Sequence, residues 1–550
     1  MKKNLTVWNL FSVVILAAFA LFIMYPIFLI LYRSVIHGDT GALTLQNFAH
    51  FFAKKFYWGT MVNSLRVTVV STILSAALGL PLAYLMRSVK IKGSSFLNIL
   101  IVISYLSPPF IGAYAWIQML GRQGVITQFL NDTFGLHYGG VYGFAGIVLV
   151  FTLQSFPLVY IYVSGALKNL DNSLNEAAES LGCSRMGRIW KIIVPLVMPT
   201  LLASSMLVFM RVFADFGTPM LIGEGYKTLP VLIYNQFMGE VSGDDGFAAA
   251  ICCIVIGLTI VMFFVQRFLA GRNTYAMTAL KPMAAESLGG LRNILAHLAV
   301  YMVVGLAILP QFVVVYTSFL ATNGGQVFTG GFALQSYDAT LFAKDNDVIW
   351  HTYFLGLCAI AAVLVLGVLI AYLSVRKRNT LNSILDVMTM FPFIIPGSVL
   401  GIAFVFAFNK SPIILTGTAL IMIISFAVRR MPYTVRSSTA ILGNISPSIE
   451  EAAISLGASD MTTFRKITVP MMMPGVLSGA IMSWVTIISE LSSSIILYTN
   501  STQTLTVSIY TEVIRGNYGN ASAYATILTV TSILSLLLFY KVTGRRDVSV

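Results

Sequence analysis

Twelve apolar runs dominate this sequence of 550 residues, of which only 10% are charged. Soluble proteins carry about 25% charged residues, so this composition excludes a soluble domain. A transmembrane helix needs about 20 consecutive apolar residues to cross about 30 Å of hydrocarbon. Each run meets that length, and the predicted spans lie near residues 8–32, 62–86, 96–120, 142–165, 197–222, 247–269, 294–318, 352–374, 383–407, 412–434, 472–497 and 521–541. We therefore predict an all-α polytopic membrane protein with about twelve transmembrane helices.

The distribution of positive charge predicts the orientation of these spans. If the N-terminus is cytoplasmic, lysines and arginines in the inner segments outnumber those in the outer segments by about three to one. Both termini are then cytoplasmic. The net charge of +13 reflects this topology and an attraction to the anionic lipid bilayer. We expect no nucleic-acid partner, because the basic residues lie between apolar runs and form no groove.

One polar block occurs twice. Glu176–Pro195 reads EAAESLGCSRMGRIWKIIVP and Glu451–Pro470 reads EAAISLGASDMTTFRKITVP, so that the two glutamates are 275 positions apart. Earlier in each half, Ala83-Tyr84-Leu85 recurs as Ala371-Tyr372-Leu373, at an offset of 288. The chain is therefore predicted to be a duplication.

The duplication predicts two six-helix parallel repeats, related by an axis along the membrane normal, with the pore between them. The first transmembrane half covers residues 1–271 and the second covers residues 293–550. A cytoplasmic linker over residues 272–292 joins them. Both polar blocks fall on the cytoplasmic side.

Each polar block predicts a helical hairpin. Asp171 and Ser446 can cap the first helix, the alanine pair gives that helix a smooth face, and a glycine suits its C-terminus. A second amphipathic helix is expected to end at a proline that leads into the fifth span. A single block would be an ordinary surface hairpin, but two copies at matching spacing indicate a docking device.

The pattern Glu-Ala-Ala-x3-Gly-x12-Pro before the fifth span of each half resembles the EAA loop of binding-protein-dependent ABC importer permeases. The resemblance covers both halves and implies a type I ABC importer permease-like fold. In that family the loop is a coupling helix, which docks in a cleft of the ATP-hydrolysing subunit. The ATPase-coupling residues that the resemblance implies are Glu176, Ala177, Ala178, Gly182, Pro195, Glu451, Ala452, Ala453, Gly457 and Pro470.

The same resemblance implies the partners. Two copies of an ABC ATPase subunit are expected on the cytoplasmic side, an extracytoplasmic solute-binding protein on the other, and the location is a bacterial inner membrane. The sequence contains no GxxxxGK[ST] motif, so we expect no cofactor on this chain, with ATP and Mg bound by the partner ATPase. No catalytic triad or HExxH motif occurs, which favours a transport subunit over a membrane enzyme.

The substrate is less constrained by the sequence. The fused form with Ala214-Asp215-Phe216-Gly217-Thr218-Pro219 looks most like the ferric-iron branch, which also contains permeases for thiamine, aminoethylphosphonate and sugar phosphates. Ferric iron is the first choice, and the others stay open. No metal site is predicted, because the five histidines are scattered. An ion-coupled secondary transporter is the rival class, which would leave both EAA blocks unexplained.

Three charged residues inside predicted spans are candidates for the translocation pathway. Arg211 and Asp215 are four positions apart, so that we expect them to share a helix face and neutralise each other. Glu490 lies 275 positions after Asp215 but has Thr486 at i−4. A buried unpaired carboxylate is unfavourable, so Glu490 is expected to face water, to meet a partner across the pore or to be protonated. The alternative role for all three is helix packing.

Four outer segments are longer than turns and carry aromatic and acidic residues. They are candidates for docking the solute-binding protein and cover residues 34–61, 223–246, 319–351 and 498–520.

Overall fold

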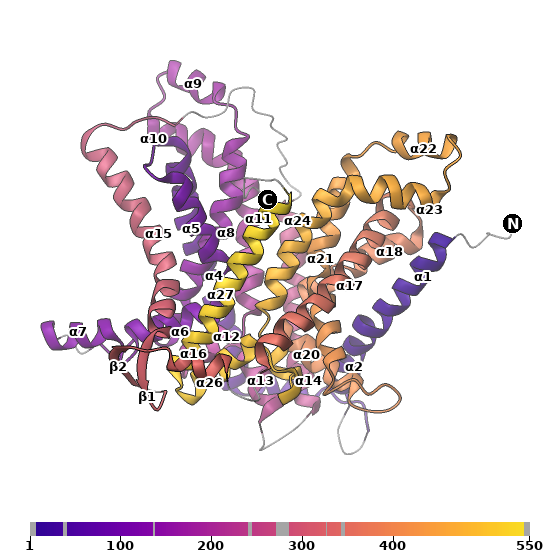
Figure 1. The fold of residues 1–550 in the computed structure, drawn as a ribbon, viewed down its shortest axis with the longest axis horizontal. Helices are drawn as coiled ribbons and strands as arrows, with labels where there is room; N and C mark the ends of the chain where they lie inside the picture. The colour runs from indigo at the N-terminus through magenta and orange to yellow at the C-terminus, as the bar shows by residue number, and fades with distance from the viewer. Residues whose placement is uncertain are drawn as a thin grey trace. The chain divides into compact units, whose positions relative to one another are not determined.

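The computed structural model describes residues 7–36, 41–135, 138–239, 245–270, 285–325, 327–342 and 347–543 (Figure 1). The described chain is helical apart from one two-stranded hairpin. Two compact units are present: unit 1 comprises Met1–Ala53, Ile233–Ile256 and Gln335–Arg546, and unit 2 comprises Lys54–Leu232, Gly257–Leu334 and Asp547–Val550.

The two units divide the chain differently from the predicted sequence halves. Each half contributes its first transmembrane helix to the unit that contains the later helices of the other half. Most of the predicted linker, residues 272–284, lies outside the described residues, as do the two ends of the chain. The spatial units are therefore not the two sequence repeats.

Unit 1 contains the N-terminal helices and most of the second half. Its elements are α1 (Val7–Phe19), η1 (Ala20–Met24), α2 (Tyr25–Ser34), α3 (Gln46–Ala53), α16 (Gln335–Leu341), α17 (Val348–Arg376), α18 (Thr380–Met388), α19 (Phe391–Ile394), α20 (Gly397–Phe408), α21 (Ala419–Asn444), α22 (Ser448–Ser455), α23 (Asp460–Thr463), η3 (Phe464–Thr468), α24 (Val469–Ile488), α25 (Ser494–Leu497), η4 (Asn500–Thr502), α26 (Leu505–Arg515) and α27 (Tyr518–Thr543).

Unit 2 contains most of the first half and the first helix of the second half. Its elements are α4 (Lys55–Ser88), α5 (Ser94–Leu106), α6 (Pro109–Leu120), α7 (Val125–Phe134), α8 (Gly143–Lys168), α9 (Ser173–Ser180), α10 (Arg185–Arg188), η2 (Ile189–Ile193), α11 (Val194–Ala214), α12 (Gly217–Ile222), α15 (Gly290–Ser318), β1 (Leu320–Asn323) and β2 (Val327–Phe332). The division between the units falls within α13 (Leu229–Met238) and α14 (Asp245–Ala270).

The prediction of an all-α polytopic membrane fold is confirmed. Among the described residues, nine helices are long and apolar enough to cross a membrane, and two bent helix pairs raise the number to eleven. The remaining predicted span corresponds to α21. The span was predicted over 412–434, but the helix covers Ala419–Asn444, so that Arg429 and Arg430 lie near its middle.

The second and fourth spans of each repeat approach each other at a glycine. A Cβ atom on Gly79 in α4 would lie 2.7 Å from Cβ of Val159 in α8. The equivalent atom on Gly367 in α17 would lie 2.9 Å from Cγ2 of Thr434 in α21. Small residues allow transmembrane helices to pack closely by dispersion. The repeat is therefore preserved in helix packing and not only in the polar blocks.

The third span of each repeat is broken. The axis turns by 100° between α5 and α6, and by 111° between the helices on either side of Pro396. Pro108 and Pro396 lie at these bends, each at the N-cap position of the helix that follows. Proline disfavours a helical residue before it and lacks an N–H donor, which explains why the predicted spans 96–120 and 383–407 are bent.

The fifth span of each repeat begins earlier than predicted. Pro195 and Pro470 were expected to end an amphipathic helix, but a π-helical turn precedes each of them and the helix continues into the span. In the first repeat the Val194 amide donates to the carbonyl of Ile189, a wide turn that carries the helix into the proline. The second helix of each polar block and the fifth span therefore form one continuous helix, over residues 185–214 and 460–488.

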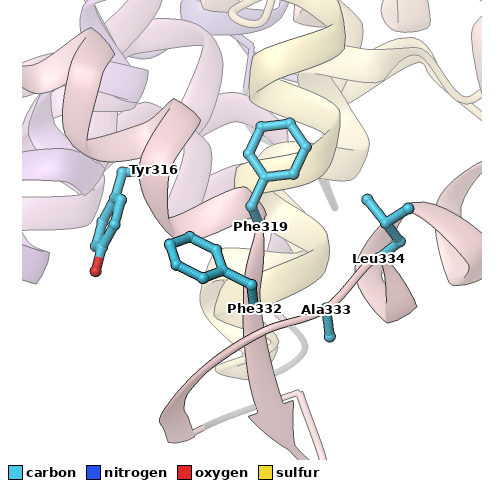
Figure 2. A pocket seen from close by; sticks show the side chains of 5 residues that line it. All are labelled: Tyr316, Phe319, Phe332, Ala333 and Leu334. Atoms are coloured by element: carbon cyan, nitrogen blue, oxygen red, sulfur yellow. The ribbon is translucent and has the colours of Figure 1, made fainter.

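The hairpin of β1 and β2 follows α15 and frames a shallow apolar pocket of about 270 Å³ (Figure 2). Tyr316, Phe319, Phe332, Ala333 and Leu334 line it. Phe319 and Phe332 belong to the segment 319–351 that we predict as one docking area for the solute-binding protein, and Tyr316 lies in the last turn of α15.

Candidate functional site

The two EAA helices end in the same backbone motif. In α9, the Cys183 amide donates to the Ala178 carbonyl over 2.9 Å and the Gly182 amide donates to the Glu179 carbonyl over 2.9 Å. In α22, the Ala458 amide donates to Ala453 over 3.1 Å and the Gly457 amide donates to Ile454 over 2.9 Å. These pairs form a Schellman motif, which closes a helix C-terminus with a left-handed residue.

The glycine of each block is required by its backbone conformation. Gly182 has φ +78° and Gly457 has φ +91°, and no heavy atom would lie within 4 Å of a Cβ atom at either position. A side chain would therefore be strained by the backbone and not by crowding. A serine follows each turn and caps the next helix: Ser184 accepts from the Gly187 amide and Ser459 from the Thr462 amide.

Each EAA turn presents an exposed leucine that the sequence reasoning did not select. The side chains of Leu181 and Leu456 are 87% and 90% exposed. The two residues occupy the same position of the repeat, directly before the glycine. The sequence does contain a signal for them, because both polar blocks have a leucine directly before the glycine. Both loops therefore expose an apolar side chain at the same place, which makes the two leucines candidates for contact with a partner.

The predicted coupling residues differ in exposure between the two copies. Glu176 and Ala177 of α9 are exposed, as are Glu451 and Ala452 of α22. Ala178 is half-buried, whereas Ala453 is buried. The glutamate, the first alanine and the leucine therefore form the outward surface of both loops. Figure 1 shows α9 beyond the ends of α8 and α11, and α22 beyond the ends of α21 and α24.

Glu490 is the centre of a buried charge cluster in the second repeat. Its carboxylate accepts from Arg429 and Arg430 of α21 and from the Ser493 amide over 3.1 Å. Only 2% of its side chain is exposed. Of the three alternatives predicted for Glu490, exposure to water is wrong, and the carboxylate instead has charged partners on a neighbouring helix. Helical spacing does not predict these arginines, because they lie 60 and 61 positions before Glu490.

Asp215 occupies the equivalent place in the first repeat. Its Oδ1 accepts from the Thr218 amide over 2.9 Å, as Glu490 accepts from Ser493, 275 positions later. Helix α11 ends at Ala214, so that the helix face which Asp215 was predicted to share with Arg211 is interrupted. The Arg211 guanidinium lies over the Tyr105 ring, 4.8 Å from its centroid. In both repeats an acidic side chain thus caps the break at the end of the fifth span.

The bend of the third span in the second repeat packs against this charge cluster. A Cβ atom on Gly397 would lie 2.3 Å from Nη1 of Arg429 and 2.8 Å from Cβ of Ser492. In the first repeat, Gln154 takes the place of Arg429 and donates to the Pro109 carbonyl over 3.0 Å. The same two segments therefore meet in both repeats, with a charged contact in one and a neutral contact in the other.

We predict that Gly397→Ala destabilises the protein. Forcing a methyl group into this packed contact should lower stability by about 1–3 kcal/mol, measured as a lower melting temperature of the purified protein in detergent. Gly305→Ala in α15 is the control, since no heavy atom would lie within 4 Å of its Cβ. Equal melting temperatures for the two variants would contradict the packing argument.

Within the described part of the chain, no group of three or more His, Cys, Asp or Glu residues could hold a metal ion. The polar features are instead two exposed loops and two capped breaks in the fifth spans. Residues 75–275 and 363–546 match the family described as binding-protein-dependent transport system inner membrane component. The chain belongs to this family. It is an ABC importer permease, a non-catalytic transport subunit of the inner membrane with multiple spans.

Two of the relatives described here match most of this permease, and a third matches less than half of it. The ferric transport system permease protein FbpB of Actinobacillus pleuropneumoniae is 30% identical over 97% of this chain and 78% of its own. The Fe(3+)-transport system permease protein FbpB 2 of Haemophilus influenzae is 25% identical over 87% of this chain and 89% of its own. The molybdenum transport system permease protein ModB of Escherichia coli is 28% identical over 39% of this chain and 93% of its own.

Permeases of this family act with an ATPase and a solute-binding protein, so that partners of both kinds follow from the family match.

Proposed function

We propose that this permease forms the translocation path for ferric iron, which an external binding protein delivers. The observation that carries this proposal is the 30% identity, over 97% of the chain, to a permease named for ferric transport. The fused two-repeat organisation agrees with it. Scattered histidines are also compatible, since a permeating ion has to be released and tight coordination belongs to the binding protein.

Two ATPase subunits dock on the cytoplasmic side, one at the turn of each EAA helix. The matching Schellman motifs and the exposed leucines support this assignment, because equal partners need equal surfaces. ATP and Mg²⁺ are bound by those subunits. Each loop is continuous with a fifth span, so that closure of the ATPases tilts the two continuous helices and alternates access to the path. Both chain termini lie on the same side as the loops.

The path passes the breaks at the ends of the fifth spans, where Asp215, Arg211 and Glu490 lie. Interrupted helices are found in membranes where the backbone lines a cavity or is covered by protein, and transporters use them at substrate sites. The carboxylates cap the breaks and hold their shape.

An oxyanion is the second candidate cargo, because the charge cluster of the second repeat contains two guanidinium groups and one carboxylate. Its excess of positive charge would attract an anion and repel a ferric ion. This candidate includes phosphonates, sugar phosphates and molybdate. Thiamine, a cation, gains no support from the cluster.

The experiment that separates these cargoes uses the binding protein that works with this permease. We expect ferric iron at about 100 times its Kd to stabilise that protein by about 2.7 kcal/mol, seen as a rise in melting temperature. Liposomes that contain the permease and its ATPase should then take up ⁵⁵Fe from the loaded binding protein, dependent on ATP. Stabilisation by a phosphonate, a sugar phosphate or molybdate, with ferric iron silent, would refute the iron assignment.

A further inference from the structure

The two EAA loops share an outward surface but differ in how they are attached to the membrane helices. No residue of α9 is buried, whereas Glu450 and Ala453 of α22 are buried. Glu450 directly precedes the predicted coupling residue Glu451, and its counterpart 275 positions earlier is Asn175. The attachment therefore differs at a residue that faces inward and is not part of the repeated motif.

A buried ion pair fixes the second loop to α17. The Arg376 Nε donates to Glu450 Oε1 over 2.9 Å, and its Nη2 donates to the Ile445 carbonyl, over 2.7 Å, at the C-cap of α21. The side chains of Arg376 and Glu450 are only 10% and 12% exposed. Tyr372 donates to the other Glu450 oxygen over 3.5 Å. Charged hydrogen bonds in a low-dielectric site are strong. The Arg376 guanidinium therefore connects the C-terminus of α21 to the first turn of α22.

A second set of contacts supports the same attachment. Lys377 pairs with Asp460 at the start of α23 over 3.1 Å. The rings of Trp8 in α1, Tyr372 in α17 and Phe464 in η3 lie with their centroids 4.6–5.3 Å apart. Aromatic pairs at this spacing add to the stability gained from burial. The second loop is thus held on both of its helices.

The first repeat keeps the tyrosine of the attachment, as Tyr84, but lacks the charged residues that form its two ion pairs. By the offset of 288, Ser88 and Val89 take the places of Arg376 and Lys377. By the offset of 275, Asn175 takes the place of Glu450 and Arg185 that of Asp460. Two neutral side chains cannot form the ion pair, and an arginine cannot replace the aspartate. The difference in attachment between the two loops therefore follows from their residue types.

We infer that the second EAA loop is rigidly coupled to α17 through Glu450 and Arg376, and that the first loop lacks this coupling to α4. Movement of an ATPase at the second loop is then transmitted directly to α17, whereas Ser88 and Asn175 cannot form the corresponding ion pair in the first repeat. Glu450 and Arg376 are positioning residues in this scheme, since neither belongs to the outward surface. The inference rests on the proposal that the loops dock ATPases.

The variant Glu450→Gln tests the inference, because it removes the charge and keeps the shape. In amide hydrogen exchange of the purified permease, residues 448–456 should exchange at least tenfold faster and approach the rate of residues 173–180. ATPase copurification should stay unchanged. In liposomes, the number of ⁵⁵Fe ions imported per ATP hydrolysed should fall several-fold, because the ATPases still turn over while their movement is no longer transmitted.

Two further variants keep the test decisive. Arg376→Gln combined with Glu450→Gln leaves no uncompensated charge, so it decides the matter if the single variant does not fold. Asp386→Asn is the control, since it breaks a partly exposed pair with Arg436 between α18 and α21 and should leave exchange and the transport ratio unchanged. Wild-type exchange and a wild-type ratio in the folded double variant would overturn the inference. If the variants Leu181→Asp and Leu456→Asp both bind the ATPase as the wild type does, the proposed docking is refuted instead.

Discussion

Replacing both exposed leucines, Leu181→Asp together with Leu456→Asp, should abolish ATPase copurification and ATP-dependent uptake. Interface residues that anchor a partner contribute about 2 kcal/mol or more each, which is roughly a 30-fold loss of affinity per loop. Both side chains point into solvent, so the variant should insert and fold as the wild type does. The measurements are copurification of the ATPase and uptake in liposomes.

The control and the single variants sharpen this experiment. Leu43 is also exposed, at 82%, but lies outside the EAA loops, and Leu43→Asp should retain the ATPase. Each single variant should retain a reduced interaction through the other loop. Normal ATPase copurification by the double variant would show that these leucines do not form the docking surface. Gly457→Asp should act in the same direction by straining the turn at φ +91°.

Removing the charge of Glu490 should be the most damaging single change to folding. Glu490→Gln leaves Arg429 and Arg430 in a buried site without a counter-charge, and breaking a buried ion pair of this kind costs about 3–5 kcal/mol. We expect a sharply lower yield and melting temperature in detergent. A melting temperature equal to that of the wild type would contradict the cluster as described.

A neutral version of the cluster separates folding from transport. Gln154 and Ser155 occupy the places of Arg429 and Arg430 in the first repeat, so Arg429→Gln and Arg430→Ser introduce side chains that the fold already accepts there, and Glu490→Gln removes the remaining charge. This triple variant should recover most of the lost stability, as neutral replacement of buried ion pairs often does. If it folds, its uptake rate reports whether the charges serve the cargo.

Prolines explain where the predicted spans departed from the structure. Pro108 and Pro396 bend the third spans, although the apolar runs continue past them. Pro195 and Pro470 do not end a helix, because a π-helical turn precedes each. The same residue type breaks one helix and is accommodated in another. Local sequence carries no information on which neighbouring helix will cover the freed carbonyl, so these outcomes could not be predicted.

The candidate site was predictable in part for a related reason. The EAA helix, its glycine turn and the serine cap use contacts between residues at most five positions apart, and such contacts are encoded locally. The partners of Glu490 lie 60 and 61 positions away, and Arg376 lies 74 positions from Glu450. Helical spacing reports only neighbours at i±3 and i±4, so it left Glu490 without a partner and overlooked Glu450.

The sequence by itself determined the membrane class, the number of spans to within one, the duplication and the position of both loops. Apolar length, charge bias and repetition are properties of the chain read in order, and the bilayer converts them directly into structure. Only the tertiary structure decided which charges neutralise each other and which loop is fixed to its helices. Those outcomes depend on side chains from different helices that meet in space. In the low-dielectric interior their hydrogen bonds are strong, although the partners are far apart in the sequence.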